Sequence, residues 1–461
     1  MGRNIWRRCL WVGLGVFVGV PIAVMIILSI VFRVNAIRPD QAQPPRGLIK
    51  TAAATPGDHQ TTGTLGWMPA KPPANFEALI AASPNKEYAE LYTKLMTQEI
   101  YKKWQKGGFD RWRGEPLTPE QAQWLINHRG LIDDLLRLAK AGGYPLMTVE
   151  QMMTLDPWDA FRWPMPNYLE IQTFGRILSA EAMRRFAAGD QAGAAEALLA
   201  IGPIARSTSE PFLISHLIGI AMQQVAAREV SRWLESGELS PSTARSLGGQ
   251  LATNPIDLNN YRRAMELEYY NTRGVMTLMM QGSLGRIVQM SMQGNTNESF
   301  LPYLYRGLTT HPITTARELA HSTAMGIVLK ADASQTLENF DSNYQKMFDA
   351  MDRNEIVDPN SLTRRNWFDP IPNFMEAQTR TNASLAVLEL DIAGLNLLAG
   401  QPTVEQQDRF IEQPLKTVQE ADATLIYSVG PDRQDQRAEI TYDPTNGTMS
   451  AGDIWIRVKK R

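Results

Sequence analysis

One apolar run near the start of the chain differs from everything that follows it. Cys9–Phe32 reads CLWVGLGVFVGVPIAVMIILSIVF and contains no charged residue. A helix that crosses a bilayer needs about 20 consecutive apolar residues, so this run is long enough to span one. Pro21 lies within the run, and membrane helices tolerate such a break when the freed carbonyl finds another donor. The pattern predicts a single transmembrane helix that contacts the lipid bilayer.

The residues that flank the run indicate its orientation. Three arginines precede it with no acid among them, which favours an N-terminus in the cytoplasm. We therefore expect residues 1–33 to be a cytoplasmic tail and anchor in the cytoplasmic membrane, with the rest of the chain outside the cytoplasm. The alternative is a signal peptide that is cleaved after Ala36. The apolar run is longer than the usual signal-peptide core of about 7–15 residues, which favours the anchor.

A proline-rich segment separates the anchor from the body. Residues 34–75 carry seven prolines together with Gly, Thr and Ala, a composition typical of a semi-extended tether. From residue 76 to about residue 420, apolar positions recur at helical spacing. The clearest series is Ile171, Phe174, Leu178 and Ala182. Residues 76–420 are therefore predicted to form a helical body.

Short turns divide this body into helix pairs. The run FAAGDQAGAAEAL within residues 168–237 resembles the turn between the helices of tetratricopeptide repeats, and LESGELSPSTARSL is a weaker echo of it. A true repeat array needs at least three units with a fixed period. The sequence has only two irregular ones, so we expect stacked helix hairpins that are tetratricopeptide-like without being a regular array.

The period changes near the C-terminus. Within residues 421–461, apolar residues alternate with other residues in two short runs, and turn signals lie between the runs. The alternating positions are Leu425, Tyr427 and Val429, then Ile454, Ile456 and Val458. The expected fold is mainly α, with a small antiparallel β meander at the C-terminus.

Composition limits the compartment and the partners. The net charge is −2, and no basic excess points to nucleic acid. Cys9 is the only cysteine among 461 residues and lies at the membrane edge. An exported body of this size without disulfides depends on its core for stability, which suits a bacterial envelope.

Two features of the helical body are candidates for ligand binding. The stretch VMTLMMQGSLGRIVQMSMQ is rich in methionine, a residue that fills irregular gaps in cores and also lines adaptable apolar grooves. Core filling is the default interpretation, and binding of an apolar ligand is the alternative. The methionines that would line such a site are Met276, Met279, Met280 and Met290.

His216 is the second candidate, because it lies inside the apolar segment 209–234. A histidine on an apolar helix is usually a hydrogen-bonded core residue, and a ligand or base is the rarer alternative. The segment itself is interpreted as a central buried helix. Nearby, Arg262 and Glu266 are four residues apart, which on a helix predicts an ion pair at the surface.

The motifs of several enzyme classes are absent from the sequence. No histidine has another four residues away, as the HExxH motif of zinc proteases requires. There is no GxSxG elbow, no Walker loop and no GxGxxG fingerprint. With Cys9 at the membrane, the body has no thiol for catalysis. The sequence therefore favours a protein that is not an enzyme and offers no catalytic residue.

Two parts of the chain resemble known families. The anchored helical body, especially residues 168–237, resembles an uncharacterised family of bacterial membrane-anchored helical proteins. The segment IYSVGPDRQDQ, residues 426–436, is similar to the end of the globular domain of type II secretion major pseudopilins. In those domains acids and carbonyls near this turn bind calcium, and Asp432 and Asp435 are the acids that match by position. The resemblance thus implies an envelope location and a calcium site, although Gln436 and Arg437 replace the glycine pair of that pattern.

Three hypotheses for function follow. The first is an envelope protein whose helical domain is a binding or scaffold module for another envelope protein, without a cofactor. The second is a carrier or sensor of a lipid or apolar peptide that uses the methionine-rich stretch. The third is a hydrolase of an unrecognised type. A scaffold predicts an exposed groove or patch, a carrier predicts a deep cavity lined by the methionines, and a hydrolase predicts acids or a histidine in a cleft.

Overall fold

The computed structural model describes part of the chain, namely residues 117–140, 142, 168–209, 212–253, 255–281, 333–353, 355, 361–362, 371–401, 406–443 and 450–460. The predicted anchor, with Cys9, Pro21 and Phe32, lies outside the described residues. So do the tether and Met290.

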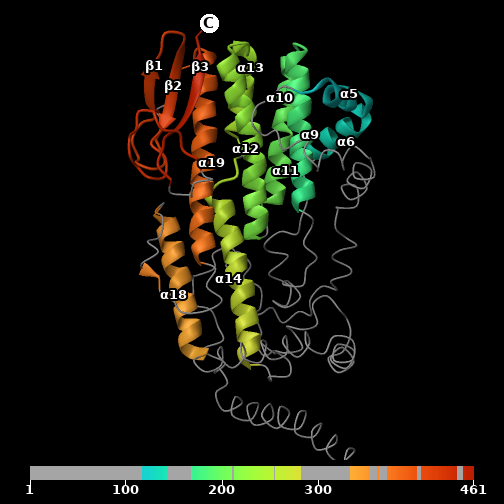
Figure 1. Ribbon diagram of the computed structural model, residues 1–461. Helices are drawn as coiled ribbons and strands as arrows, with labels where there is room; N and C mark the ends of the chain where they lie inside the picture. The colour runs from blue at the N-terminus through green and yellow to red at the C-terminus, as the bar shows by residue number, and fades with distance from the viewer. Residues whose placement is uncertain are drawn as a thin grey trace, which may run out of the picture.

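The prediction of a mainly helical protein is confirmed, because helices make up 67% of the described residues. Their bounds are α5 Pro119–Asn127, α6 Arg129–Lys140, α9 Tyr168–Ala187, α10 Gln191–Leu199, α11 Ile201–Thr208, α12 Leu213–Ser236, α13 Pro241–Leu251, α14 Leu258–Gln281, α18 Ala333–Asp352 and α19 Ile371–Leu398. Figure 1 shows them in an elongated arrangement, with α14 and α18 at one end and α13 at the other. None of these helices is both long and apolar enough to cross a membrane.

Two helix hairpins form the middle of the body, one of α9 and α10 and one of α12 and α13. Each second helix begins with a side-chain cap. Asp190 accepts from the amide of Gly193 (2.9 Å), and Ser240 accepts from the amide of Thr243 (3.1 Å). Gly237 ends α12 with a φ of 73°, a left-handed conformation that favours glycine. The chain therefore reverses sharply at both positions.

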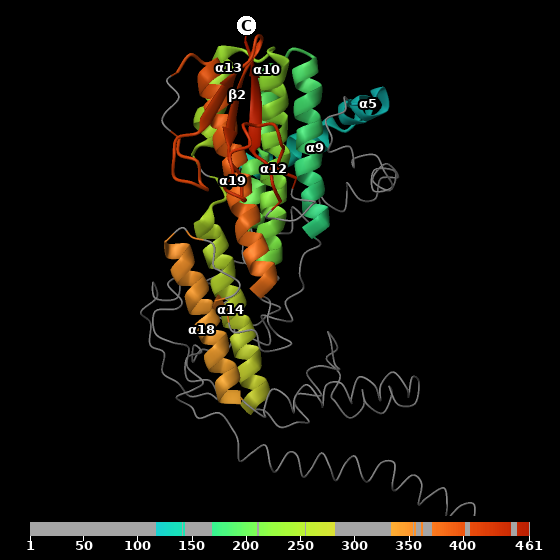
Figure 2. The same cartoon turned by 60° about the vertical axis from the view of Figure 1, so that its left-hand side comes forward.

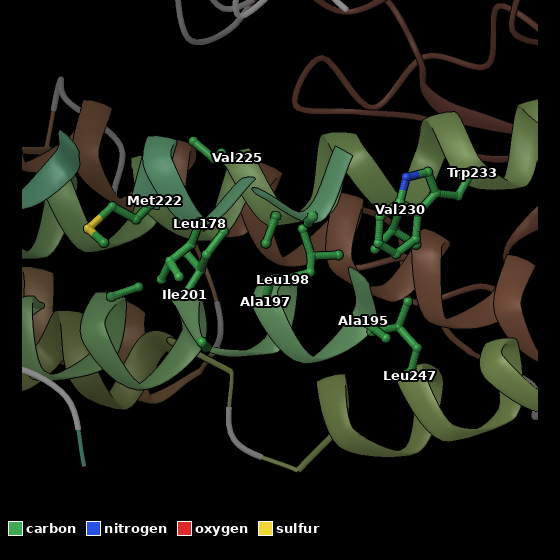
Figure 3. Close-up of a cluster of buried hydrophobic side chains, with 14 of the residues drawn as sticks. Leu178, Ala195, Ala197, Leu198, Ile201, Met222, Val225, Val230, Trp233 and Leu247 are labelled. Carbon is green, nitrogen blue, oxygen red and sulfur yellow. The ribbon is translucent and has the colours of Figure 1, made fainter. Parts of the chain in front are cut away.

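Helix α12 lies at the centre of the larger core, as the sequence predicts. It packs against α9, α11, α14, α19 and strand β3 (Ile454–Lys459). Figure 3 shows how side chains from successive helices interdigitate there, with Leu178 of α9, Leu198 of α10 and Ile201 of α11 near Met222 and Val225 of α12. These side chains belong to one buried cluster. We call this cluster the first core.

A second, separate core lies between α14 and α18. Its members include Tyr261, Tyr269 and Met276 of α14 and Tyr344 and Phe348 of α18. Figure 2 shows α14 and α18 side by side, beyond the end of the α12–α19 bundle. The stacking of Tyr269 and Phe340, whose ring centroids are 5.6 Å apart, is part of this packing.

The ion pair predicted at the surface is buried instead. The side chain of Glu266 is 1% exposed and that of Arg262 is 13% exposed. The prediction was wrong because α18 covers this side of α14. Arg262 also binds Asp352 of α18 (2.6 Å), and its guanidinium lies 4.6 Å from the ring centroid of Phe348.

The C-terminal meander is confirmed as a three-stranded antiparallel sheet in the order β1-β2-β3, with β1 Lys416–Gln419, β2 Ala423–Ser428 and β3 Ile454–Lys459. Ile426 pairs with Ile456, and Thr424 pairs with Val458. The inner face of the sheet packs on α12 and α19. Strand β1 was not predicted. It precedes residue 421 and has a single apolar side chain, Val418.

Candidate binding groove

The two hairpins are fastened to each other at their turns by Gln191, the first residue of α10. Its amide nitrogen donates to the carbonyl of Glu238 (2.8 Å), and its amide oxygen accepts from the backbone N–H of Ser240 (2.8 Å). A primary amide that bonds both a donor and an acceptor of one turn fixes the separation and the register of the helices beside it. Helices α10 and α13 consequently lie in contact along one side of the body.

An open groove of about 760 Å³ lies along this pair, and its two walls differ in chemistry. One wall carries apolar side chains, most of them small, from Ala192, Ala195, Leu199, Ala200 and Pro203. The other carries hydroxyls and an amide, from Ser242, Thr243, Ser246 and Gln250. This volume lies within the range of about 300–1,000 Å³ that is usual for ligand sites. The groove can therefore receive a segment with an apolar edge and a hydrogen-bonding edge.

The polar wall is a regular stripe. Ser242, Ser246 and Gln250 are spaced four residues apart on α13, so they fall on one face of the helix. Gln250 donates to the hydroxyl of Ser246 (3.1 Å). The wall opposite has Ala192, Ala195 and Leu199 at helical spacing, and small side chains there allow another backbone to approach closely.

The charges at the α6 end of the groove neutralise each other. Lys140 binds Glu196 (2.5 Å), and Arg185 lies 3.4 Å from the other oxygen of Glu196. Lys140 and Glu196 are the two charged residues that line the groove among the described residues. The groove therefore has no net charge along its lining, which favours an uncharged segment over a strongly charged one.

Arg185 is itself held in place by a buried carboxylate. It donates to Glu181 (2.6 Å), and Arg184 binds the same carboxylate through two nitrogens (2.7 and 2.8 Å). Burial would raise the pKa of Glu181, but the hydrogen bonds and charges of the two arginines leave it below its usual range. The carboxylate therefore stays ionised and orients Arg185 towards Glu196.

A smaller groove of about 200 Å³ continues from the larger one. The two share Leu199, Pro203 and Gln250. The smaller groove adds Gly202 and Arg206 of α11, and burial lowers the pKa of the Arg206 guanidinium. Together they form one continuous furrow beside α10, α11 and α13. We call this furrow the hairpin groove.

Sequence reasoning did not find the hairpin groove. The sequence does carry a signal, since one helix has apolar residues at positions 192, 195 and 199 and another has polar residues at 242, 246 and 250. Alanine and serine are common in helices, however, and their presence alone does not indicate a binding site. Only the contact between the two hairpins brings the two stripes together.

His216 is not among the residues that line the groove. Its side chain is fully buried, and Nε2 lies 2.9 Å from the hydroxyl of Thr381 on α19. Its ring is 5.5 Å from the ring of Tyr261 on α14. Burial lowers the pKa of His216 to about 3. The expectation of a hydrogen-bonded core histidine is confirmed.

The methionine candidates fall partly within the described residues. Met276 is 2% exposed and belongs to the second core. The side chains of Met279 and Met280 and the whole of Met290 lie outside the described part. Met276 thus fills a packed core, which is the default interpretation of the methionine-rich stretch.

The two acids matched to the pseudopilin turn have partners within the chain. Asp435 binds Lys416 (2.6 Å) and accepts from the hydroxyl of Tyr427 (3.2 Å). The hydrogen bond from Lys416 lowers the pKa of Asp435. Asp432 accepts from the side chain of Gln436 (2.8 Å). No group of three or more metal-ligating side chains occurs in the described residues, and calcium binding here stays a prediction.

Comparison with known proteins gives no match. No family model matches the chain, and neither a curated protein nor a solved structure is similar to it. Function is therefore argued from the groove itself.

Proposed function

We propose that the chain is a single-pass protein of the cytoplasmic membrane, whose extracytoplasmic helical domain is a binding module for another envelope protein. The hairpin groove is the surface that receives the partner. The single observation that supports this most is the open groove of about 760 Å³ between two fastened hairpins. Residues 1–33 would anchor the domain, and residues 34–75 would give it reach.

The chemistry of the walls defines the segment that fits. Its apolar edge, with small side chains, packs against Ala192, Ala195 and Leu199. Its other edge carries groups that hydrogen-bond the hydroxyls of Ser242 and Ser246. A short protein segment without net charge meets both requirements, and it would leave the Lys140–Glu196 pair undisturbed.

Site-specific crosslinking in cells tests this proposal. We would place a photo-reactive amino acid at Ser246 in the full-length chain and identify the adduct by mass spectrometry. The expected result is one discrete protein adduct. It should disappear when Ala192→Trp fills the facing wall of the groove.

A matched control uses Ala188, which is exposed at the end of α9 and does not line the groove. Ala188→Trp should leave the Ser246 adduct intact, and the photo-reactive residue placed at 188 should not give it. An adduct of equal strength from position 188, or one that survives Ala192→Trp, would contradict the proposal.

A further inference from the structure

A layer of buried polar side chains separates the two hydrophobic cores. On α12, Leu213 belongs to the second core and Ile220 to the first. On α19, Ala377 belongs to the second core and Ala383 to the first. Between them lie buried polar residues, namely Ser215 and His216 on α12 and Gln378, Thr379, Thr381 and Asn382 on α19. We call this set the polar layer.

The hydrogen bonds of Thr381 fix the protonation state of His216. The hydroxyl of Thr381 donates its single hydrogen to the carbonyl of Ala377 (2.8 Å). It can therefore only accept from His216, so Nε2 carries the histidine proton. Nδ1 is then a bare acceptor, and it has no hydrogen-bond partner within the described part of the chain. A second proton, on Nδ1, would make the buried imidazole positively charged. The new N–H would have no acceptor within the described residues.

Charged groups on the neighbouring helices do not offset such a charge. Glu268 on α14 accepts from the amide of Leu213 (3.1 Å). Arg380, beside Thr381, pairs with Glu376 at the surface of α19. Arg206 of α11 lines the smaller groove.

Other charges around α12 are also engaged elsewhere. Glu229 of α12 pairs with Arg232, and Glu181 of α9 pairs with Arg184 and Arg185. Glu196 of α10 pairs with Lys140, and Arg457 of β3 pairs with Glu420 and Asp422. Tyr261 is the titratable group whose ring faces His216, and burial raises its pKa, so it stays neutral.

Helices α14 and α18 are joined to each other by ion pairs and hydrogen bonds. Arg273, which is fully buried, binds Asp341 of α18 through two nitrogens (2.8 and 2.9 Å), and the hydroxyl of Tyr269 donates to the same carboxylate (2.7 Å). Arg262 binds Asp352 at the other end of the pair. Figures 1 and 2 show that the part of α14 nearest Leu258 lies beside α12 and α19, while its far part extends beyond them with α18. The polar layer lies at this junction, and separation of the pair from the bundle there also withdraws Leu213 of α12 and Ala377 of α19 from the second core.

We propose that the α14–α18 pair is an acid-released subdomain, which separates from α12 and α19 at the polar layer when His216 takes up a proton. The closed form keeps His216 neutral because the layer offers its second nitrogen no partner. Once the layer opens, water solvates the imidazole and its ordinary basicity returns. Acid therefore shifts the population towards the open form.

The sign and size of the effect follow from proton linkage. The pKa of His216 is about 3 in the closed form, against an ordinary value of 6.5, so opening takes up a proton at any pH between them. The closed form is most strongly favoured above pH 6.5, and its advantage over the open form decreases as the pH falls below that value. The open population should rise roughly 10-fold per pH unit below 6.5, or on the order of 30-fold at pH 5.

Glu268 opposes this change. Burial raises its pKa, so opening releases its proton at pH values above its ordinary 4.5. Its contribution favours closure as the pH falls. The wild-type response should therefore be smaller than 30-fold, and Glu268→Gln should reveal the full response.

Hydrogen exchange of the full-length chain in detergent, measured by mass spectrometry at pH 7.5 and 5.0 and corrected for intrinsic rates, tests the proposal. In Glu268→Gln, peptides covering residues 213–219 and 258–270, which meet at the polar layer, should lose roughly 30-fold protection at pH 5.0, while peptides of α10, α13 and α18 keep theirs. The wild type should lose less. In His216→Gln the acid-dependent loss should vanish.

His128→Gln is the matched control, because His128 is half-buried against Trp124 of α5, far along the chain from the layer, and this variant should respond as the wild type does. Equal protection at both pH values in Glu268→Gln would overturn the proposal. So would an acid loss spread evenly over both cores, or one that persists in His216→Gln. If His216→Gln does not fold, the comparison of Glu268→Gln with the wild type still decides the matter.

Discussion

At the scale of single residues, Asp391 is a buried acid that packs beside the first core. It is fully buried on α19, and one carboxyl oxygen accepts from Ser231 of α12 (2.7 Å). The other oxygen has no partner within the described residues. Burial raises the pKa of Asp391 well above its ordinary value of 3.8. The folded chain therefore keeps a proton that the unfolded chain releases, and stability is lost as the pH rises above 3.8.

Asp391→Asn should remove this loss, because asparagine keeps the shape and the acceptor for Ser231 without an ionisable proton. We expect the variant to be more stable than the wild type by about 1–3 kcal/mol at pH 7, with the gain shrinking towards pH 4. Chemical denaturation followed by tryptophan fluorescence measures this, since Trp124 and Trp233 are buried in the first core. The same change at Asp133, an exposed residue of α6, should alter stability by less than about 0.5 kcal/mol. A variant at position 391 that is less stable at pH 7 would contradict the prediction.

At the scale of elements, the close crossing of α11 and α12 depends on Gly219. A Cβ there would lie 2.6 Å from the carbonyl oxygen of Ala205 and 2.8 Å from Cβ of Ser209. Gly219→Ala should therefore cost about 1–3 kcal/mol despite the better helix propensity of alanine. Gly202 is the matched control, because a Cβ on this helical glycine meets nothing within 4 Å. Gly202→Ala should stabilise the fold by about 0.5–1 kcal/mol, and thermal unfolding of both variants should give shifts of opposite sign.

The elements that the sequence predicts well are those with one periodic apolar face. Ile171, Phe174, Leu178 and Ala182 are all buried along α9, as their spacing requires. Strand β1 escaped prediction because four residues with one apolar side chain carry no readable period. The burial of Glu266 escaped it because the covering helix, α18, lies some 70 residues away along the chain. For the same reason, the pairings of Thr381 with His216 and of Asp391 with Ser231 cannot be predicted from one sequence.

At the scale of the whole molecule, the proposed anchor would hold the hairpin groove close to the membrane. A binding module held by one span searches a thin layer beside the membrane, so weak contacts in the groove act at high effective concentration. The length of the proposed tether, residues 34–75, would then set which partners the hairpin groove can reach. The groove gains this high effective concentration only if the anchor stays attached to the body.

Fractionation of cells that express the full-length chain should find it in the membrane, released by detergent and not by high salt, with its body open to protease added outside the cytoplasmic membrane. An arginine near the centre of a membrane helix costs about 2.5–3.5 kcal/mol, so Val24→Arg combined with Ile27→Arg should move the chain out of the membrane fraction. Thr51→Arg in the tether is the control and should leave the fractionation unchanged. A mature N-terminus at Ile37 would show that residues 1–36 are a cleaved signal. The module would then have to find its partner by free diffusion.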